Sequence, residues 1–89
     1  MKILAVCGNG LGSSMMLAMT VKKVIGSMGV TADVSNTDLA SSKTERADYY
    51  IGSPEIMAQL DDGTRKVISV KNLLSASEIE EALSAHLNA

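Results

Sequence analysis

Few of the residues that build common binding and redox sites occur in this 89-residue sequence. Aromatic residues are almost absent, with two tyrosines and neither tryptophan nor phenylalanine, so a stacking platform for nucleic-acid bases is not expected. Eight basic residues face ten acidic ones, and a net charge of −2 argues against a surface that binds nucleic acid. One cysteine and one histidine make neither a disulfide nor a Cys/His zinc site, so no metal or other cofactor is expected.

Long apolar runs are also missing. No stretch approaches the ~18 residues of a membrane span, and the beginning of the chain lacks the apolar region of a signal peptide. We therefore expect a cytoplasmic protein without a membrane span of its own. The composition is 46% hydrophobic and 20% charged with one proline, as in a globular protein, and the length predicts a single domain over residues 1–89.

What is present is an alternation of short apolar runs with helical patterns. The continuous apolar run at 2–7 predicts a strand buried on both faces. It is followed by a helix that starts at Ser13 or Ser14 and ends at Met28, before Gly29. The later expected elements are a strand at 30–34, a loop with room for one helical turn at 38–46, a strand at 47–52, a helix from Ser53 to about Leu60, a turn at 61–63, a strand at 66–70 and a helix from Ser75 onward.

This order predicts the fold class. Strands that alternate with helices form parallel sheets with right-handed crossovers. We expect an α/β domain with a four-stranded parallel sheet, helices on both faces, and a phosphate-binding loop after the first strand.

The feature that carries chemistry is a cysteine followed by a glycine-rich loop. Cys7 ends the first expected strand, where ligands bind in open α/β sheets. Glycines let backbone N–H groups converge on an anion, and a helix N-terminus adds positive charge. Such a cradle lowers a thiol pKa from ~8.5 toward ~4–7 and would hold a phosphoryl group on the sulfur. The cradle residues are Gly8, Asn9, Gly10, Leu11, Gly12, Ser13 and Ser14. The alternative is a buried cysteine without a chemical role.

Other phosphate-binding loops fit less well. A Walker A loop needs a lysine before the serine, and a dinucleotide-binding loop needs glycine at position 13, which is Ser13. A tyrosine-phosphatase loop has an arginine six residues after the cysteine, whereas Arg46 and Arg65 lie elsewhere. Without that guanidinium, hydrolysis is poorly supported, which favours a carrier that holds its phosphoryl group for an acceptor.

The segment from Cys7 to Met15 resembles the phosphorylation loop of IIB components of the bacterial phosphoenolpyruvate-dependent sugar phosphotransferase system. It is most similar to the ascorbate-type subfamily, whose loop reads Cys-Gly-Asn-Gly-x-Gly-Ser-Ser-Met. The resemblance covers essentially the whole chain, including 47–51 as the third strand and 70–74 after the fourth.

The resemblance implies a function. Cys7 would take a phosphoryl group from a phosphohistidine of the IIA partner and pass it to a sugar, L-ascorbate or a related compound, held by the membrane IIC component. Gly8 to Ser14 would form the cradle, and IIC would recruit the protein to the inner face of the membrane.

Three weaker signals accompany the loop. Met15, Met16 and Met19 fill a core in the simplest interpretation. In the alternative they form an apolar rim that docks both partners, with Met15 and Met16 as the docking residues. Ser53 is a helix cap that could also reach the phosphate and contact partners. His86 is expected at the surface, far from Cys7.

Two other functions remain open at this stage. One is a small cysteine-dependent phosphatase related to the low-molecular-weight tyrosine phosphatases. The other is an anion-binding regulatory module in which Cys7 has no chemical role.

Overall fold

The computed structural model describes residues 1–7 and 11–87 and contains four strands and four helices within them. Strands alternate with helices along the whole described chain, as expected. The elements are β1 (Lys2–Cys7), α1 (Leu11–Met28), β2 (Asp33–Asp38), α2 (Leu39–Ser42), β3 (Tyr49–Gly52), α3 (Pro54–Leu60), β4 (Val67–Ser69) and α4 (Ala76–Leu87).

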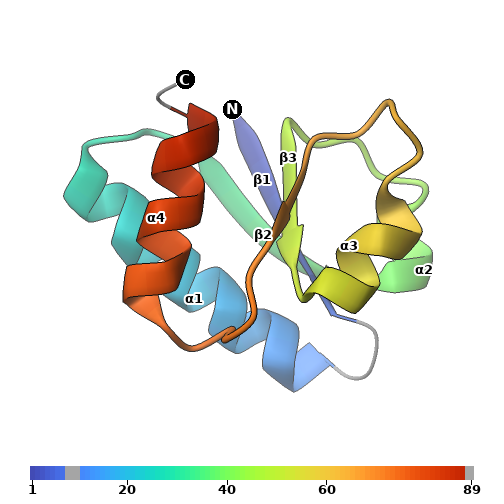
Figure 1. Cartoon of the computed structure of the whole chain (residues 1–89), viewed down its shortest axis with the longest axis horizontal. Coiled ribbons are helices and arrows are strands. Elements are labelled where there is room, and N and C mark those ends of the chain that lie inside the picture. Colours follow the sequence, from blue (N-terminus) through green and yellow to red (C-terminus); the bar gives the residue numbers. More distant parts are fainter. Residues whose placement is uncertain (8–10, 88–89) are drawn as a thin grey trace.

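The four strands form one parallel sheet in the order β2-β1-β3-β4. Helices α1 and α4 cover one face of the sheet, and α2 and α3 cover the other (Figure 1). The predicted fold class is therefore confirmed. Because the chain passes from β1 to β2 on one side and then to β3 on the other, the strand order reverses between β1 and β3. Ligands of open α/β sheets bind at such a reversal, beyond the carboxyl ends of the strands.

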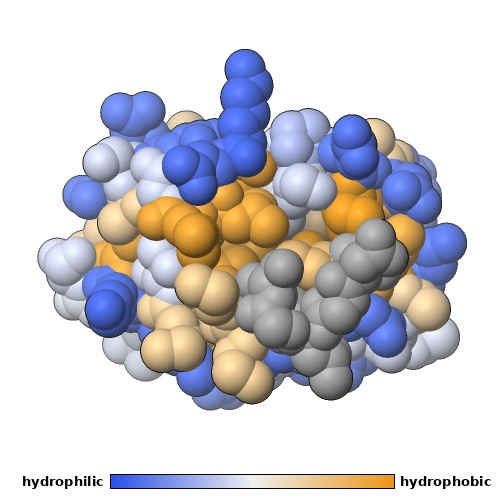
Figure 2. Space-filling view, turned by 90° about the horizontal axis from the view of Figure 1, so that it is seen from below, coloured by the Kyte–Doolittle hydropathy of each residue, from blue (hydrophilic) through white to orange (hydrophobic). Residues whose placement is uncertain are grey.

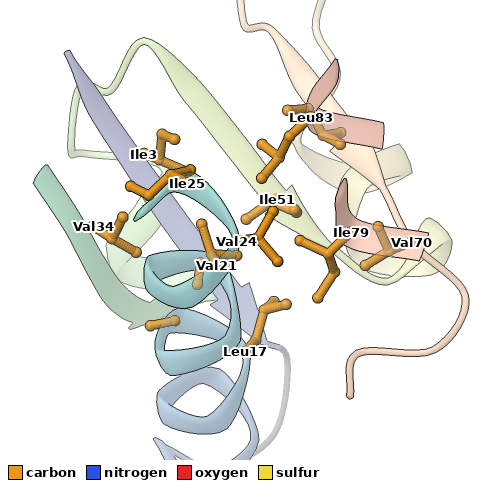
Figure 3. Packing of buried hydrophobic residues seen from close by; sticks show 13 residues of the cluster. Ile3, Leu17, Val21, Val24, Ile25, Val34, Ile51, Val70, Ile79 and Leu83 are labelled. Atoms are coloured by element: carbon orange, nitrogen blue, oxygen red, sulfur yellow. The ribbon is translucent and has the colours of Figure 1, made fainter. Parts of the chain in front are cut away.

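Strand β1 supplies side chains to two separate cores. Ile3 and Ala5 belong to the larger core under α1 and α4, whereas Leu4 and Val6 belong to the smaller core under α2 and α3. All four are fully buried, which explains why this strand has an unbroken apolar sequence. Figure 3 shows how side chains from α1, α4 and the sheet meet in the larger core.

The second strand lies further along the chain than the sequence predicts. Gly29 has a φ of +74°, and the N–H of Val30 donates to the carbonyl of Ile25 at 3.0 Å, which closes the end of α1. Pairing with β1 begins only where the N–H of Asp33 donates to Met1 at 2.8 Å. The predicted strand at 30–34 is therefore wrong for most of its length. The apolar residues there connect α1 to the sheet, and β2 itself is a largely polar edge strand.

A cluster around Tyr50 fixes the segment that leads from α2 to β3. The Tyr50 hydroxyl donates to the carbonyl of Glu45 at 2.7 Å and accepts from the N–H of Ala47 at 3.1 Å. Arg65 lies 5.8 Å from the centre of the Tyr50 ring and donates to the carbonyl of Lys43 at 2.9 Å. These contacts connect the segment to the strand that it enters.

Helix α4 begins at a site held by a carboxylate. The N–H of Glu78 donates to the Ser75 hydroxyl at 3.2 Å, which is the first half of the predicted capping box. The Glu78 carboxylate completes a different contact, because it accepts from the backbone N–H groups of Lys71 and Asn72. It therefore joins the start of α4 to the chain that leaves β4.

Candidate active site

Cys7 is the last residue of β1 and lies at the carboxyl edge of the sheet, where the strand order reverses. Its neighbour in the register of β2 is Asp38, and the preceding residue Val6 is paired with Gly52 of β3. Helix α1 begins four residues later, with its N-terminus at the same edge (Figure 1). The edge thus brings together Cys7, a helix N-terminus and the ends of two neighbouring strands.

The Cys7 side chain is buried. The residue is 6% exposed, and burial raises the pKa of its thiol, opposite to the lowering that the sequence predicts. Removal of water from around the sulfur disfavours the charged thiolate. The predicted lowering depends on N–H groups of Gly8, Asn9 and Gly10, which lie outside the described residues.

The remaining predicted cradle residues form the first turn of α1. The backbone from Leu11 to Ser14 is helical, so the predictions that Leu11 and Gly12 belong to the loop and that Ser13 or Ser14 caps the helix are wrong. The helix begins sooner because one glycine does not prevent helix formation when a long, amphipathic helix follows it. The first N–H groups of a helix have no partner within the helix, and those of α1 lie four residues beyond the sulfur in the chain.

Gly52 permits β1 and β3 to approach each other beside the sulfur. A Cβ atom at this position would lie 2.5 Å from the carbonyl oxygen of Val6 and 3.0 Å from the terminal methyl group of Met57. The next residue, Ser53, occupies the N-cap position of α3, but its side chain makes no capping hydrogen bond. This role of Gly52 is not visible in the sequence, because the close approach involves strands that are distant along the chain.

The methionines at the start of α1 face outward. Met15, Met16 and Met19 are 53%, 51% and 56% exposed, and Leu74, which precedes α4, is 59% exposed. The core-filling interpretation of these methionines is therefore wrong. Figure 2 views the carboxyl edge and shows apolar residues gathered over the middle of this face, with hydrophilic residues around them. We call Met15, Met16, Met19 and Leu74 the apolar rim.

His86 and a cavity lie apart from Cys7. His86 is exposed and its ring meets that of Tyr49 edge-on, 6.4 Å between centroids. Tyr49 is paired with Ile3, at the opposite end of β1 from Cys7, so the expected distance between the histidine and the cysteine is confirmed. A cavity of about 380 Å³ is lined by Arg46, Arg65 and the Tyr50 cluster. Both arginines of the chain therefore line this cavity. A phosphatase would require an arginine at the cysteine site.

Residues 1–7 and 11–87 were searched for a metal site and for a membrane-spanning helix. No group of three or more histidine, cysteine, aspartate or glutamate side chains is arranged to hold a metal ion among them. None of the helices in this part of the chain is long and apolar enough to cross a membrane.

Comparison with known proteins identifies the family of this fold and site. Residues 2–85 match the family described as "PTS system, Lactose/Cellobiose specific IIB subunit". The chain is 34% identical to the ascorbate-specific PTS system EIIB component of Mycoplasma pneumoniae over 85 residues, which cover 92% of this chain and 90% of the relative. It is also 34% identical to the protein of that name from Escherichia coli over 92 residues, with 96% and 91% covered.

A solved structure shares the fold. The lactose-specific IIB domain of the phosphoenolpyruvate:carbohydrate phosphotransferase system from Streptococcus pneumoniae superposes with a TM-score of 0.69. The alignment covers 99% of this chain and 95% of that domain at 16% sequence identity.

Proposed function

The chain belongs to the lactose/cellobiose-specific IIB subunit family of the phosphotransferase system, and from this membership we propose that Cys7 carries the phosphoryl group. A IIB subunit is a phosphotransferase component of sugar transport, so its chemistry needs one nucleophile that accepts a phosphoryl group and releases it again. The chain has a single cysteine, at the carboxyl edge of the sheet where ligands of this fold bind. This position is the observation that carries the proposal.

The proposed cycle consists of two in-line transfers. In the first, the Cys7 sulfur attacks the phosphorus of a phosphohistidine on the IIA partner; an S–P bond forms, the N–P bond breaks, and the imidazole takes up the proton that the thiol loses. In the second, a sugar hydroxyl bound by IIC attacks the same phosphorus; an O–P bond forms, the S–P bond breaks, and the hydroxyl proton returns to the thiolate. Burial raises the pKa of the thiol, so in the proposed cycle the sulfur gives up its proton during the attack on the phosphohistidine.

Backbone N–H groups are the proposed binding partners of the phosphoryl oxygens. The segment from Gly8 to Ser14 supplies them, with the hydroxyls of Ser13 and Ser14. The start of α1 at Leu11 supports this role, since unpaired N–H groups and the helix dipole both favour an anion. Catalysis in this scheme depends on positioning and electrostatics, and it uses neither a metal nor another cofactor.

The proposed acceptor is L-ascorbate or a related sugar. Relatives that align with most of this chain carry the name ascorbate-specific EIIB component, and the similarity supports the same substrate class here. The sugar itself would be bound by the IIC permease, so this domain would meet it only through the phosphoryl group on Cys7.

Both partners are proposed to dock at the carboxyl edge. The exposed Met15 and Met16 lie on the first turns of α1 beside the site, and Ser53 lies at the end of the strand next to β1. Flexible methionine side chains adapt to differently shaped partners, which suits a surface that receives IIA and IIC in turn. We place the protein in the cytoplasm, at the inner face of the membrane when IIC is bound.

Intact-mass spectrometry tests the carrier function. Wild-type protein incubated with phosphoenolpyruvate, the general phosphotransferase proteins and an ascorbate-type IIA should gain one phosphoryl group, and Cys7→Ser should gain none. His86→Ala is the matched control, because it removes the single histidine of the chain, the residue type that carries phosphate on the IIA partner, and lies far from the site; it should be labelled like the wild type. A label that persists in Cys7→Ser, or is lost in His86→Ala, contradicts the assignment.

A further inference from the structure

A carboxylate stands next to Cys7 in the sheet. Cys7 and Asp38 are the last residues of β1 and β2 and are paired in the parallel register. Paired residues of adjacent strands lie about 5 Å apart. Asp38 lies in the predicted loop at 38–46, because the second strand begins and ends later than predicted, so the sequence does not indicate this neighbour of Cys7.

The two residues occupy equivalent positions in the alternation of their strands. Ile3 and Ala5 of β1, and Val34 of β2, belong to the core under α1, and Cys7 and Asp38 follow them at the same alternate spacing. The backbone of Asp38 is extended, with φ −88° and ψ 173°, so the alternation continues to the end of the strand. The Asp38 carboxylate itself reaches the first turn of α2, where it accepts from the N–H of Ser41.

The charge of Asp38 is fixed by a local contact. Its Oδ1 atom accepts a hydrogen bond of 2.7 Å from the N–H of Ser41, as the N-cap of α2. Hydrogen bonding to Ser41 lowers the pKa of Asp38, with the larger effect from the Ser41 backbone N–H and a smaller one from its side chain. The side chain is therefore ionised at neutral pH and held at the start of α2, next to the end of β1 that carries Cys7.

We propose that Asp38 is a positioning residue that sets the phosphoryl-transfer potential of Cys7, because its carboxylate repels the phosphoryl group carried on the neighbouring sulfur. The inference rests on the proposed function of Cys7. A thiol brings no charge to the site, but a phosphothiol brings about two negative charges. The repulsion therefore raises the free energy of the phosphorylated form more than that of the free form.

This difference affects the two transfers in opposite directions. Transfer from the phosphohistidine to Cys7 becomes less favourable, and transfer from Cys7 to the sugar hydroxyl becomes more favourable by the same factor. The backbone N–H groups proposed to bind the phosphoryl oxygens would stabilise phosphocysteine, and Asp38 limits that stabilisation. The carrier then releases its phosphoryl group and does not accumulate in the phosphorylated state.

Asp38→Asn removes the charge with little change in shape. Asparagine is as good an N-cap as aspartate, so the bond from Ser41 is retained. We expect the equilibrium constant for transfer from phosphorylated IIA to rise about 3- to 10-fold at low salt, since partly exposed charges at this separation interact moderately. The difference should shrink at high ionic strength because salt screens the repulsion. Intact-mass spectrometry of both partners at equilibrium gives the constant directly.

Asp33→Asn is the matched control. It removes one negative charge from the other end of β2, about 16 Å along the strand from Asp38, which is beyond the Debye length at physiological salt. Its equilibrium constant should equal that of the wild type. If Asp38→Asn does not fold, as judged by circular dichroism, Asp38→Ser provides another N-cap residue without the charge.

The outcomes separate this inference from the function on which it rests. A raised, salt-dependent equilibrium constant in the Asp38 variant alone supports the inference. A constant equal to that of the wild type, or a change independent of salt, overturns it while the carrier function stands. If the wild type gains no phosphoryl group from a demonstrably phosphorylated IIA, the proposed function and this inference both fail.

Discussion

At the scale of single residues, Gly52 shows how tightly the strands meet next to the sulfur. We expect Gly52→Ala to lower the free energy of unfolding by about 1–3 kcal/mol, the usual cost of an inserted methyl group in a packed site. The new Cβ atom would collide with the Val6 carbonyl, 2.5 Å away, and push β3 from β1. Because Cys7 follows Val6, phosphorylation should also slow. Urea denaturation and the rate of labelling measure the two effects.

Gly26 offers the matched control for this substitution. It is exposed on α1, and an added Cβ atom would meet nothing within 4 Å. Alanine there should raise the free energy of unfolding by about 0.5–1 kcal/mol, since glycine is costly inside a helix, and leave labelling unchanged. Equal destabilisation at the two positions would show that close packing at Gly52 is not the cause.

At the scale of elements, the start of α4 depends on the charge of Glu78. Hydrogen bonds from two backbone N–H groups lower the pKa of this carboxyl group. The bond from Lys71 has the larger effect and the bond from Asn72 the smaller. The folded-state pKa is therefore below the unfolded value of about 4.3. The stabilisation is complete above that value and is lost as the pH falls through the folded-state pKa.

Glu78→Gln should remove this acid-dependent part of the stability. At pH 7 the variant should melt a few degrees lower than the wild type, and the gap should narrow as the pH falls below about 4. Thermal melts by circular dichroism between pH 2 and 7, with Glu81→Gln on the exposed side of the same helix as control, measure the difference. A gap that stays constant over this range would contradict the role given to the Glu78 charge.

The elements also differ in how well the sequence predicts them. β1 and α3 were predictable because their signals are local: an unbroken apolar run for β1, and Ser53-Pro54 at the start of α3. β2 was not, because only Val34 and Thr37 in it are buried and an edge strand needs few apolar residues. The same limit applies to the site. Cys7 is marked by its own sequence context, whereas the proximity of Asp38 and the crowding at Gly52 arise from strand pairing.

At the scale of the whole molecule, the two cores should unfold together. They lie on opposite faces of the sheet, but consecutive residues of β1 enter them alternately. Leu83→Ala in the larger core and Leu60→Ala in the smaller, both fully buried, should each lower the free energy of unfolding by about 2–5 kcal/mol. Each should shift one common transition, with an unchanged slope against urea.

Circular dichroism and tyrosine fluorescence provide independent probes of that transition. Tyr50 contributes to the smaller core and Tyr49 packs against the larger one, so fluorescence is measured in a Tyr49→Phe background, where Tyr50 is the one tyrosine left. Helix α1, the longest element, packs on the larger core. Coincident curves are expected for both variants. A fluorescence curve that separates from the circular dichroism curve in Leu60→Ala would mean that the two faces unfold independently.

The position of Cys7 at the end of a central strand affects how reliably two partners can reach the same sulfur atom. In the proposed cycle the carrier binds two partners in turn. Each of them must reach the sulfur at the same location, although the two partners need not contact each other. A side chain on a long, mobile loop could change position between the two binding events. Cys7 is anchored through β1 to strands on both sides and to cores on both faces. In the proposed cycle the domain would serve as a common reference frame, so that a partner that recognised the carboxyl edge would also have located the reacting atom.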